Sequence, residues 1–272
     1  ALNHPVKMHY SFPFHVKDGA QVDISNEKPF QAYAADAILD SMHHDKNISA
    51  ITPSTLYATD LERVFKIFPD RCFDPGMEEQ HAMSMACGMA RAGMYPVVFY
   101  QSTFLQRAFD QLIHDIGFSN NSILILSVRS GFSGYDNPTH HGIYDLSYLR
   151  SVPNLEIFYP SNGKHLYELI LSVLKNPSGP KLVFLPYGFD DENKIKFQGS
   201  LPKDPLKFHQ VRDGEDCLIL TLGNKVNHAI ETHNLLLKKN IKSSILNINQ
   251  IKPIKYNDLL PIIKKFKYLF TL

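Results

Sequence analysis

The sequence predicts an α/β fold, in which a parallel sheet with helices on both faces is followed by a second, smaller α/β domain. Two observations support this prediction. Short apolar runs alternate with helical stretches along residues 29–188, and the runs at 96–100 and 123–128 are almost wholly apolar. Strands of this kind are typical of parallel sheets that helices cover on both sides. The alternation starts again at residue 217, after a polar stretch that prolines interrupt.

The elements of the first unit follow from these patterns in order. Phe30, Ala34, Ile38 and Met42 share one face at helical spacing, and Pro29 suits the first turn of that helix. Further helices are expected at 79–92, 104–118 and 165–174, and strands at 48–52, 96–100, 123–128 and 181–185.

The second unit repeats the pattern on a smaller scale. Its strands are expected at 217–222, 243–249 and 267–272, and its helices at 227–238 and 258–264. The chain then divides into a linker at 1–28, a first domain at 29–188, a linker at 189–213 and a second domain at 214–272. Because the second unit ends on a strand after few others, we expect it to be part of a larger domain.

Composition narrows the class of protein. The 272 residues carry a net charge of +1, so no overall field favours nucleic acid or a membrane surface as a partner. No apolar run reaches the length of a membrane span. The 3 cysteines are scattered without metal-ligand spacing, which fits a reducing compartment. We expect a cytoplasmic protein, with a plastid as the alternative because Ala1 reads like the middle of a longer chain.

Two adjacent acids stand at the start of a helical stretch. Glu78 and Glu79 are followed by Gln80 and His81 at the beginning of the helix expected at 79–92. The helix dipole favours carboxylates in a first turn by about 0.3–1 kcal/mol, so capping is one explanation. A binding or catalytic acid is the other, because a core helix would not otherwise place this much charge at its mouth.

The helix expected at 104–118 has two different faces. One is an apolar stripe suited to burial. Phe104, Arg107 and Gln111 share another face through their three- and four-residue spacings. Arg107 and Gln111 would not suit a core, so this face is expected to line a cleft, with an exposed helix edge as the alternative.

A glycine-rich loop follows the strand expected at 123–128. Loops beyond the carboxyl ends of strands are where open α/β sheets bind ligands. Arg129 could hold an anion there, and His140 or His141 could transfer a proton near neutral pH. A glycine-rich surface turn is the alternative, and adjacent histidines point apart, which disfavours a metal site.

Together the three stretches resemble the 1-deoxy-D-xylulose-5-phosphate synthases, a family of transketolase-like thiamine-diphosphate enzymes. The matching segments are Glu79-Gln-His81, Ser102-Thr-Phe-Leu-Gln-Arg107 with Asp110-Gln111, Thr139-His140, and Tyr144-Asp-Leu-Ser-Tyr-Leu-Arg150 with Pro153-Asn154. The resemblance covers nearly the whole chain and is densest between residues 68 and 162. Three motifs in the right order and spacing are far more specific than any one of them.

The resemblance implies a thiamine-diphosphate site in which residues 29–188 receive the aminopyrimidine ring. Glu79 matches the acid that hydrogen-bonds N1′ of that ring and so lets the cofactor remove the proton from its thiazolium C2. Phe104 matches the aromatic side chain that packs on the ring. Arg107 matches a residue of the cofactor and substrate cleft, and His81 matches its neighbour on the substrate side.

Three further residues match the substrate side of the family's site. Arg129 matches a group that binds a phosphate or carboxylate, whereas Asp136 and His140 match groups that handle hydroxyls or protons. The implied reaction condenses pyruvate with glyceraldehyde 3-phosphate and releases CO₂, giving 1-deoxy-D-xylulose 5-phosphate. Glu79 and His140 would then be the catalytic residues.

The resemblance also implies partners. Family members bind the diphosphate through Mg²⁺, which a Gly-Asp-Gly and Asn motif holds in an N-terminal domain. The sequence contains no such motif, so no metal ligand is expected in this chain and an N-terminal domain or separate subunit is required. A homodimer is implied as well.

Three positions depart from the family pattern. Gln101 stands where members carry Tyr, Tyr187 where they carry Arg, and Glu78 where they carry a small residue. The first two family residues help to hold the acceptor phosphate. A transketolase-type subunit with a different donor or acceptor is therefore one alternative. A non-catalytic module that kept the fold is another, although the intact Glu79 and His140 count against it.

Overall fold

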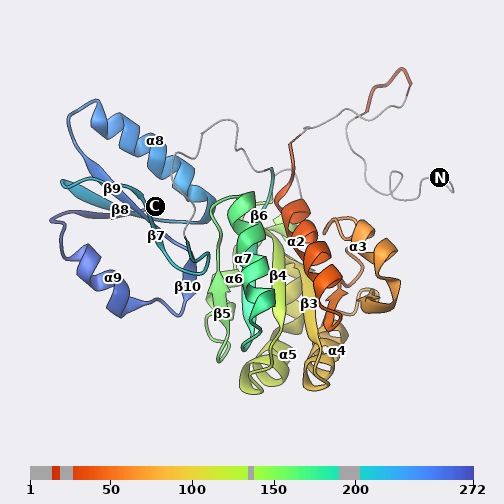
Figure 1. The fold of residues 1–272 in the computed structure, drawn as a ribbon. Helices are drawn as coiled ribbons and strands as arrows, with labels where there is room; N and C mark the ends of the chain where they lie inside the picture. The colour runs from red at the N-terminus through yellow and green to blue at the C-terminus, as the bar shows by residue number, and fades with distance from the viewer. Residues whose placement is uncertain (1–13, 19–26, 134–137, 190–202) are drawn as a thin grey trace.

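The computed structural model describes residues 14–18, 27–133, 138–189 and 203–272, in two layered α/β units (Figure 1). The larger sheet has 7 strands, in the spatial order β10 (Gln250–Lys252), β5 (Glu156–Phe158), β6 (Lys181–Pro186), β4 (Leu124–Ser130), β3 (Tyr95–Gln101), β1 (Ile48–Ile51) and β2 (Cys72–Phe73). All neighbours in this sheet are parallel except β10 and β5. The predicted α/β class is confirmed.

Helices cover both faces of the larger sheet and enclose two apolar cores. The helices of this unit are α2 (Phe30–His44), α3 (Glu62–Ile67), α4 (Glu79–Arg91), α5 (Phe109–Gln111), α6 (Asp145–Leu149) and α7 (Gly163–Lys175). On one face, α2 and α7 pack over the alternate side chains that include Val97 and Phe99. On the other face, α4 and the segment from Leu105 to Ile116 pack over Val98 and Tyr100. The period-2 alternation of strand β3 thus supplies both cores.

The smaller sheet forms the second unit. Its 4 strands lie in the order β11 (Leu269–Thr271), β8 (Cys217–Leu222), β9 (Ser243–Ile248) and β7 (His209–Arg212), with helices α8 (Val226–Leu237) and α9 (Tyr256–Ile263). Strand β8 is parallel to both β9 and β11, whereas β7 is antiparallel to β9. Among the described residues, no helix is both long enough and apolar enough to cross a bilayer.

Several short elements differ from the sequence prediction. Strand β7 lies within the residues expected to form a linker, and β10 leaves the second unit to pair with β5 of the larger sheet. The helix expected at 104–118 is a composite of a 3₁₀ helix η2 (Ser102–Ala108), α5 and a π-helical turn η3 (Leu112–Phe118). Its apolar stripe is nevertheless fully buried, as predicted.

Two buried histidines meet where the units join. The rings of His165, on α7, and His209, on β7, lie 6.0 Å apart between centroids. His165 Nδ1 accepts a hydrogen bond from the Ser161 amide at 3.1 Å, so Nε2 carries the proton and donates to Pro205 O at 2.8 Å. Burial lowers the pKa of His165. Burial, and then His165, lower the pKa of His209 from 6.5 to about 4.

We expect acid to destabilise this junction. Because the folded protein lowers the pKa of His209, the unfolded chain binds the extra proton first as the pH falls from about 6.5 to 4. The stability contributed by neutral His209 is present above pH 6.5 and is lost across this window, by up to about 3 kcal/mol. Urea unfolding at several pH values measures this slope. The pH dependence of the unfolding free energy should become weaker in His209→Gln and stay unchanged in His228→Gln. His228 lies on the exposed surface of α8 and is the matched control.

Candidate active site

A buried carboxylate begins helix α4. Glu79 is only 4 % exposed, although a capping role would be satisfied equally well by an exposed side chain. Its Oε2 accepts a hydrogen bond from Arg107 Nη1 at 3.0 Å, and the same nitrogen donates to Met77 O at 3.3 Å. The preceding Glu78 is exposed and makes no side-chain cap to the helix. Burial with a charged partner therefore distinguishes Glu79 from an ordinary first-turn acid.

Strand β3 holds the backbone of Glu79 in place. The hydroxyl of Tyr100 donates to Glu79 O at 2.8 Å. Burial, and then the Glu79 carboxylate, raise the pKa of Tyr100, so this phenol stays protonated and remains a donor. The start of α4 is thereby fixed to the end of the central sheet.

The 3₁₀ geometry of η2 aligns two of the predicted site residues. With about three residues per turn, side chains at i and i+3 lie one above the other, so Phe104 and Arg107 project on one side. Leu105 and Ala108 are fully buried on the opposite side. The Phe104 ring meets His140 edge to face, with 5.5 Å between centroids and 73° between planes. Glu79 thus pairs with Arg107, and Phe104 contacts His140; because η2 carries one residue of each pair, these four residues are treated as one group.

The end of β4 and the segment that follows it carry two more predicted residues, Arg129 and His140. Arg129, at the carboxyl end of β4, adopts a φ of 62° and places its guanidinium 5.5 Å from the ring centre of Tyr187. His140 ends the short 3₁₀ helix η4 (Pro138–His140), and its Nδ1 lies 3.0 Å from Thr139 Oγ1. The Thr103 hydroxyl donates to Thr139 O at 2.9 Å, which joins this loop to η2.

One described residue of the prediction, His81, stands apart from this group. His81 is exposed, and its side chain leaves α4 on a different side from Glu79, because residues two apart on a helix do not face each other. Asp136 lies outside the described residues.

Sequence reasoning missed a buried acid behind the group. Asp145 is 3 % exposed and bonds the hydroxyl of Ser102, the first residue of η2. The available signal was that Asp145 lies inside the segment 144–150, which carries part of the family resemblance. Burial raises the pKa of Asp145 to about 6, although its bond to Ser102 acts in the opposite direction.

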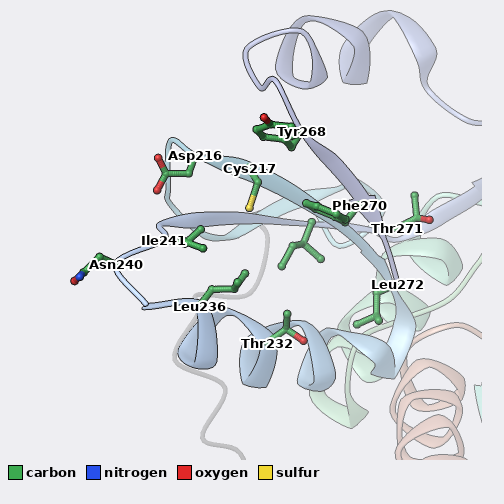
Figure 2. A pocket seen from close by; sticks show the side chains of 11 residues that line it. Asp216, Cys217, Thr232, Leu236, Asn240, Ile241, Tyr268, Phe270, Thr271 and Leu272 are labelled. Atoms are coloured by element: carbon green, nitrogen blue, oxygen red, sulfur yellow. The ribbon is translucent and has the colours of Figure 1, made fainter. Parts of the chain in front are cut away.

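An apolar pocket lies in the smaller unit, away from the four residues of this group. Figure 2 shows it between α8 and strands β8 and β11. Its volume is about 790 Å³. Its lining is mostly apolar, with Leu236, Ile241 and Phe270, although Asp216 and Asn240 also border it. Within the described ranges, no group of three or more His, Cys, Asp or Glu side chains could hold a metal ion.

The sequence matches known protein families and curated relatives. The model described as "Transketolase, pyrimidine binding domain" matches residues 27–188, and "Transketolase, C-terminal domain" matches residues 206–272. A 1-deoxy-D-xylulose-5-phosphate synthase of Halothermothrix orenii is 36% identical over 272 residues, covering 100% of this chain and 42% of the relative. The enzyme of Aquifex aeolicus is 34% identical over 279 residues, covering 100% of this chain and 43% of the relative.

Solved structures agree on the fold. A split gene transketolase, described as an inactive beta4 tetramer, has a TM-score of 0.78 and 21% identity, covering 90% of this chain and 79% of that one. A transketolase of Pichia stipitis in complex with sedoheptulose 7-phosphate has a TM-score of 0.72 and 16% identity, covering 87% and 37%. The chain spans about 42% of the length of the curated relatives it matches. These findings confirm the resemblance, and the chain belongs to the transketolase pyrimidine-binding-domain family.

Proposed function

We propose that this chain is the pyrimidine-binding portion of a thiamine-diphosphate-dependent transferase that joins pyruvate to glyceraldehyde 3-phosphate with loss of CO₂. The product would be 1-deoxy-D-xylulose 5-phosphate, an isoprenoid precursor. The observation that carries the proposal is the buried Glu79 carboxylate, paired with Arg107 beside the Phe104–His140 contact. The chain that carries this arrangement is similar along its whole length to proteins named 1-deoxy-D-xylulose-5-phosphate synthase.

The residues present suit the pyrimidine end of the cofactor. Arg107 engages Oε2 of Glu79, which leaves Oε1 to meet a ring nitrogen in a water-poor site. Phe104 offers a half-buried aromatic face on the same side as Arg107. When bound, thiamine diphosphate supplies the electron sink for the reaction. The protein's own part is to hold one carboxylate against the ring and to exclude water around it.

We propose the residues of the substrate side from where they lie in the fold. Arg129, at the carboxyl end of β4, would hold a phosphate or carboxylate, and His140 would move a proton beside the Phe104 ring. Asp136 and His81 are proposed as further substrate-side groups on the family pattern alone. The domain limits of 29–188 and 214–272 remain proposals as well.

Further polypeptide is needed for activity in this proposal. The curated relatives are more than twice as long as the matched stretch, and we assign the diphosphate and Mg²⁺ to another domain or subunit. A homodimer would complete the site. The free cysteines Cys72, Cys87 and Cys217 support a reducing compartment, the cytoplasm or a plastid.

A steady-state assay of the assembled enzyme tests the reaction. Pyruvate with glyceraldehyde 3-phosphate should give CO₂ and the deoxy-pentulose phosphate. Turnover of ketose phosphates without pyruvate would instead favour the second candidate, a transketolase-type reaction. The replacement of the family's Tyr and Arg by Gln101 and Tyr187 motivates that second candidate.

Restoring the family residues should tighten phosphate binding. Tyr187 already lies against Arg129, so Tyr187→Arg adds a second cation beside the first, and Gln101→Tyr adds a hydroxyl at the end of β3. A charge-assisted contact is worth about 1.5–3 kcal/mol, so the double variant should lower KM for glyceraldehyde 3-phosphate by about tenfold or more. Unphosphorylated glyceraldehyde is the matched control, and its KM should not change. An unchanged or raised KM for the phosphorylated aldehyde would mean that other groups hold the phosphate.

A further inference from the structure

Asp145 is a buried carboxyl group directly behind the candidate active site. One of its oxygens, Oδ2, bonds the Ser102 hydroxyl, and the other, Oδ1, is buried with no hydrogen-bond partner among the described residues. Asp145 also raises the pKa values of Tyr148 and Tyr159, after the larger effect of their burial, so both phenols lie near it. A buried acid with an unpaired oxygen lowers the stability of the fold, so a role other than stabilisation must account for Asp145.

The Asp145–Ser102 bond connects two parts of the site. Ser102 is the first residue of η2, the helix that carries Phe104 and Arg107. Asp145 is the first residue of α6, directly after the loop that carries His140. The bond therefore ties the cofactor-side helix to the substrate-side loop.

The loop also closes over this bond. A Cβ atom on Gly142 would lie 2.0 Å from Ser102 Oγ and 2.8 Å from Asp145 Oδ2, so only the bare glycine backbone fits there. Gly142 exchanges two backbone hydrogen bonds with Gly131, of 2.7 and 3.3 Å. Gly131 in turn follows the end of β4, which bears Arg129. One carboxyl group thus stands where η2, the His140 loop and the end of β4 meet.

We propose that Asp145 is a positioning residue, which holds η2, with Phe104 and Arg107, and residues 138–142, with His140, in one fixed arrangement through Ser102 and Gly142. This inference rests on the proposed function, because it assigns Asp145 to the same site. Asp145 does not itself contact Glu79, Arg107 or His140 in the described contacts, so it acts through the groups that it holds.

Amide hydrogen exchange and kinetics of the complete protein test this role together. Asp145→Ala should speed exchange at the Gly131 and Gly142 amides by about tenfold and lower kcat by about 10²-fold, because misplacement by 1 Å has that cost. KM for pyruvate should change little. Asp145→Asn keeps an acceptor for Ser102 and should restore both readouts to near the wild-type values. Ser147→Ala, an exposed change on the same short helix, is the matched control and should alter neither.

Three results would overturn the proposal. Unchanged exchange at Gly131 and Gly142 in Asp145→Ala would remove Asp145 from the positioning of the loop. Loss of kcat in Asp145→Asn equal to that in Asp145→Ala, with exchange intact, would assign the acid a direct chemical part instead. If the alanine variant does not fold, Ser102→Ala must show the same faster exchange, or the proposal fails. A wild type without turnover on pyruvate would reject the proposed function, while the exchange rates would still decide the role of Asp145.

Discussion

Replacing Glu79 with glutamine should lower kcat of the assembled enzyme by about 10²–10⁴-fold while leaving the fold intact. The amide keeps the shape of the side chain but loses the negative charge that pairs with Arg107 and that, in the proposed function, the ring nitrogen needs. Because Glu79 is only 4 % exposed, solvent cannot reach this position to compensate for the lost charge. Initial rates at saturating pyruvate, with thermal unfolding of the same samples, measure both parts of the expectation.

Glu78→Gln provides the matched control for this experiment. Glu78 is the neighbouring acid, is exposed and carries the same chemistry, so its loss should change kcat by less than about twofold. Equal losses in the two variants would mean that net charge near the helix start matters, and that the buried position of Glu79 does not. Full activity in Glu79→Gln would remove this carboxylate from the mechanism.

Gly142→Ala should both inactivate and destabilise the protein. The added methyl group would lie 2.0 Å from Ser102 Oγ, which cannot withdraw without breaking its bond to Asp145. Overpacking of this kind costs about 1–3 kcal/mol of unfolding free energy. The His140 loop must move to relieve it, and a displacement of about 1 Å lowers kcat by roughly 10²-fold. Urea unfolding and steady-state kinetics report the two effects.

Gly88→Ala is the matched control, because the same added methyl group should there raise stability instead of lowering it. A Cβ at Gly88, an exposed position inside α4, meets nothing within 4 Å. Alanine is the better helix former by roughly 0.5–1 kcal/mol, so this variant should gain stability and keep its activity. A Gly142→Ala protein as stable and active as wild type would contradict the close packing of the loop on Ser102.

The sequence pattern predicts the larger elements because each has its own periodicity. Strands such as β3 and β4 are buried on both faces, and α2 and α7 each have a buried side, so local pattern and tertiary position agree. Strands β2, β5 and β10 contain only two or three residues and depend on long-range pairing. A window of that length carries no usable periodicity, which is why these strands were missed.

Two residues of the candidate site were predictable because a charged side chain is unusual at their positions in the chain. Glu79 at a helix mouth and Arg107 on a partly buried helix are costly without a partner, and the structure pairs them. The Ser102–Asp145 bond joins residues 43 positions apart and was not predictable, because serine and aspartate are ordinary residues at helix starts. The 3₁₀ geometry that aligns Phe104 with Arg107 was missed for a related reason, since a spacing of three fits both helix types.

Deuterium exchange at C2 of bound thiamine diphosphate tests the role of Glu79 most directly, because it follows proton removal without any substrate. In the assembled wild-type enzyme, NMR of the quenched cofactor should show exchange many times faster than for free thiamine diphosphate. In Glu79→Gln the rate should fall back by about 10²-fold or more. An unchanged exchange rate in that variant, with the cofactor still bound, would contradict the assignment of this buried carboxylate to cofactor activation.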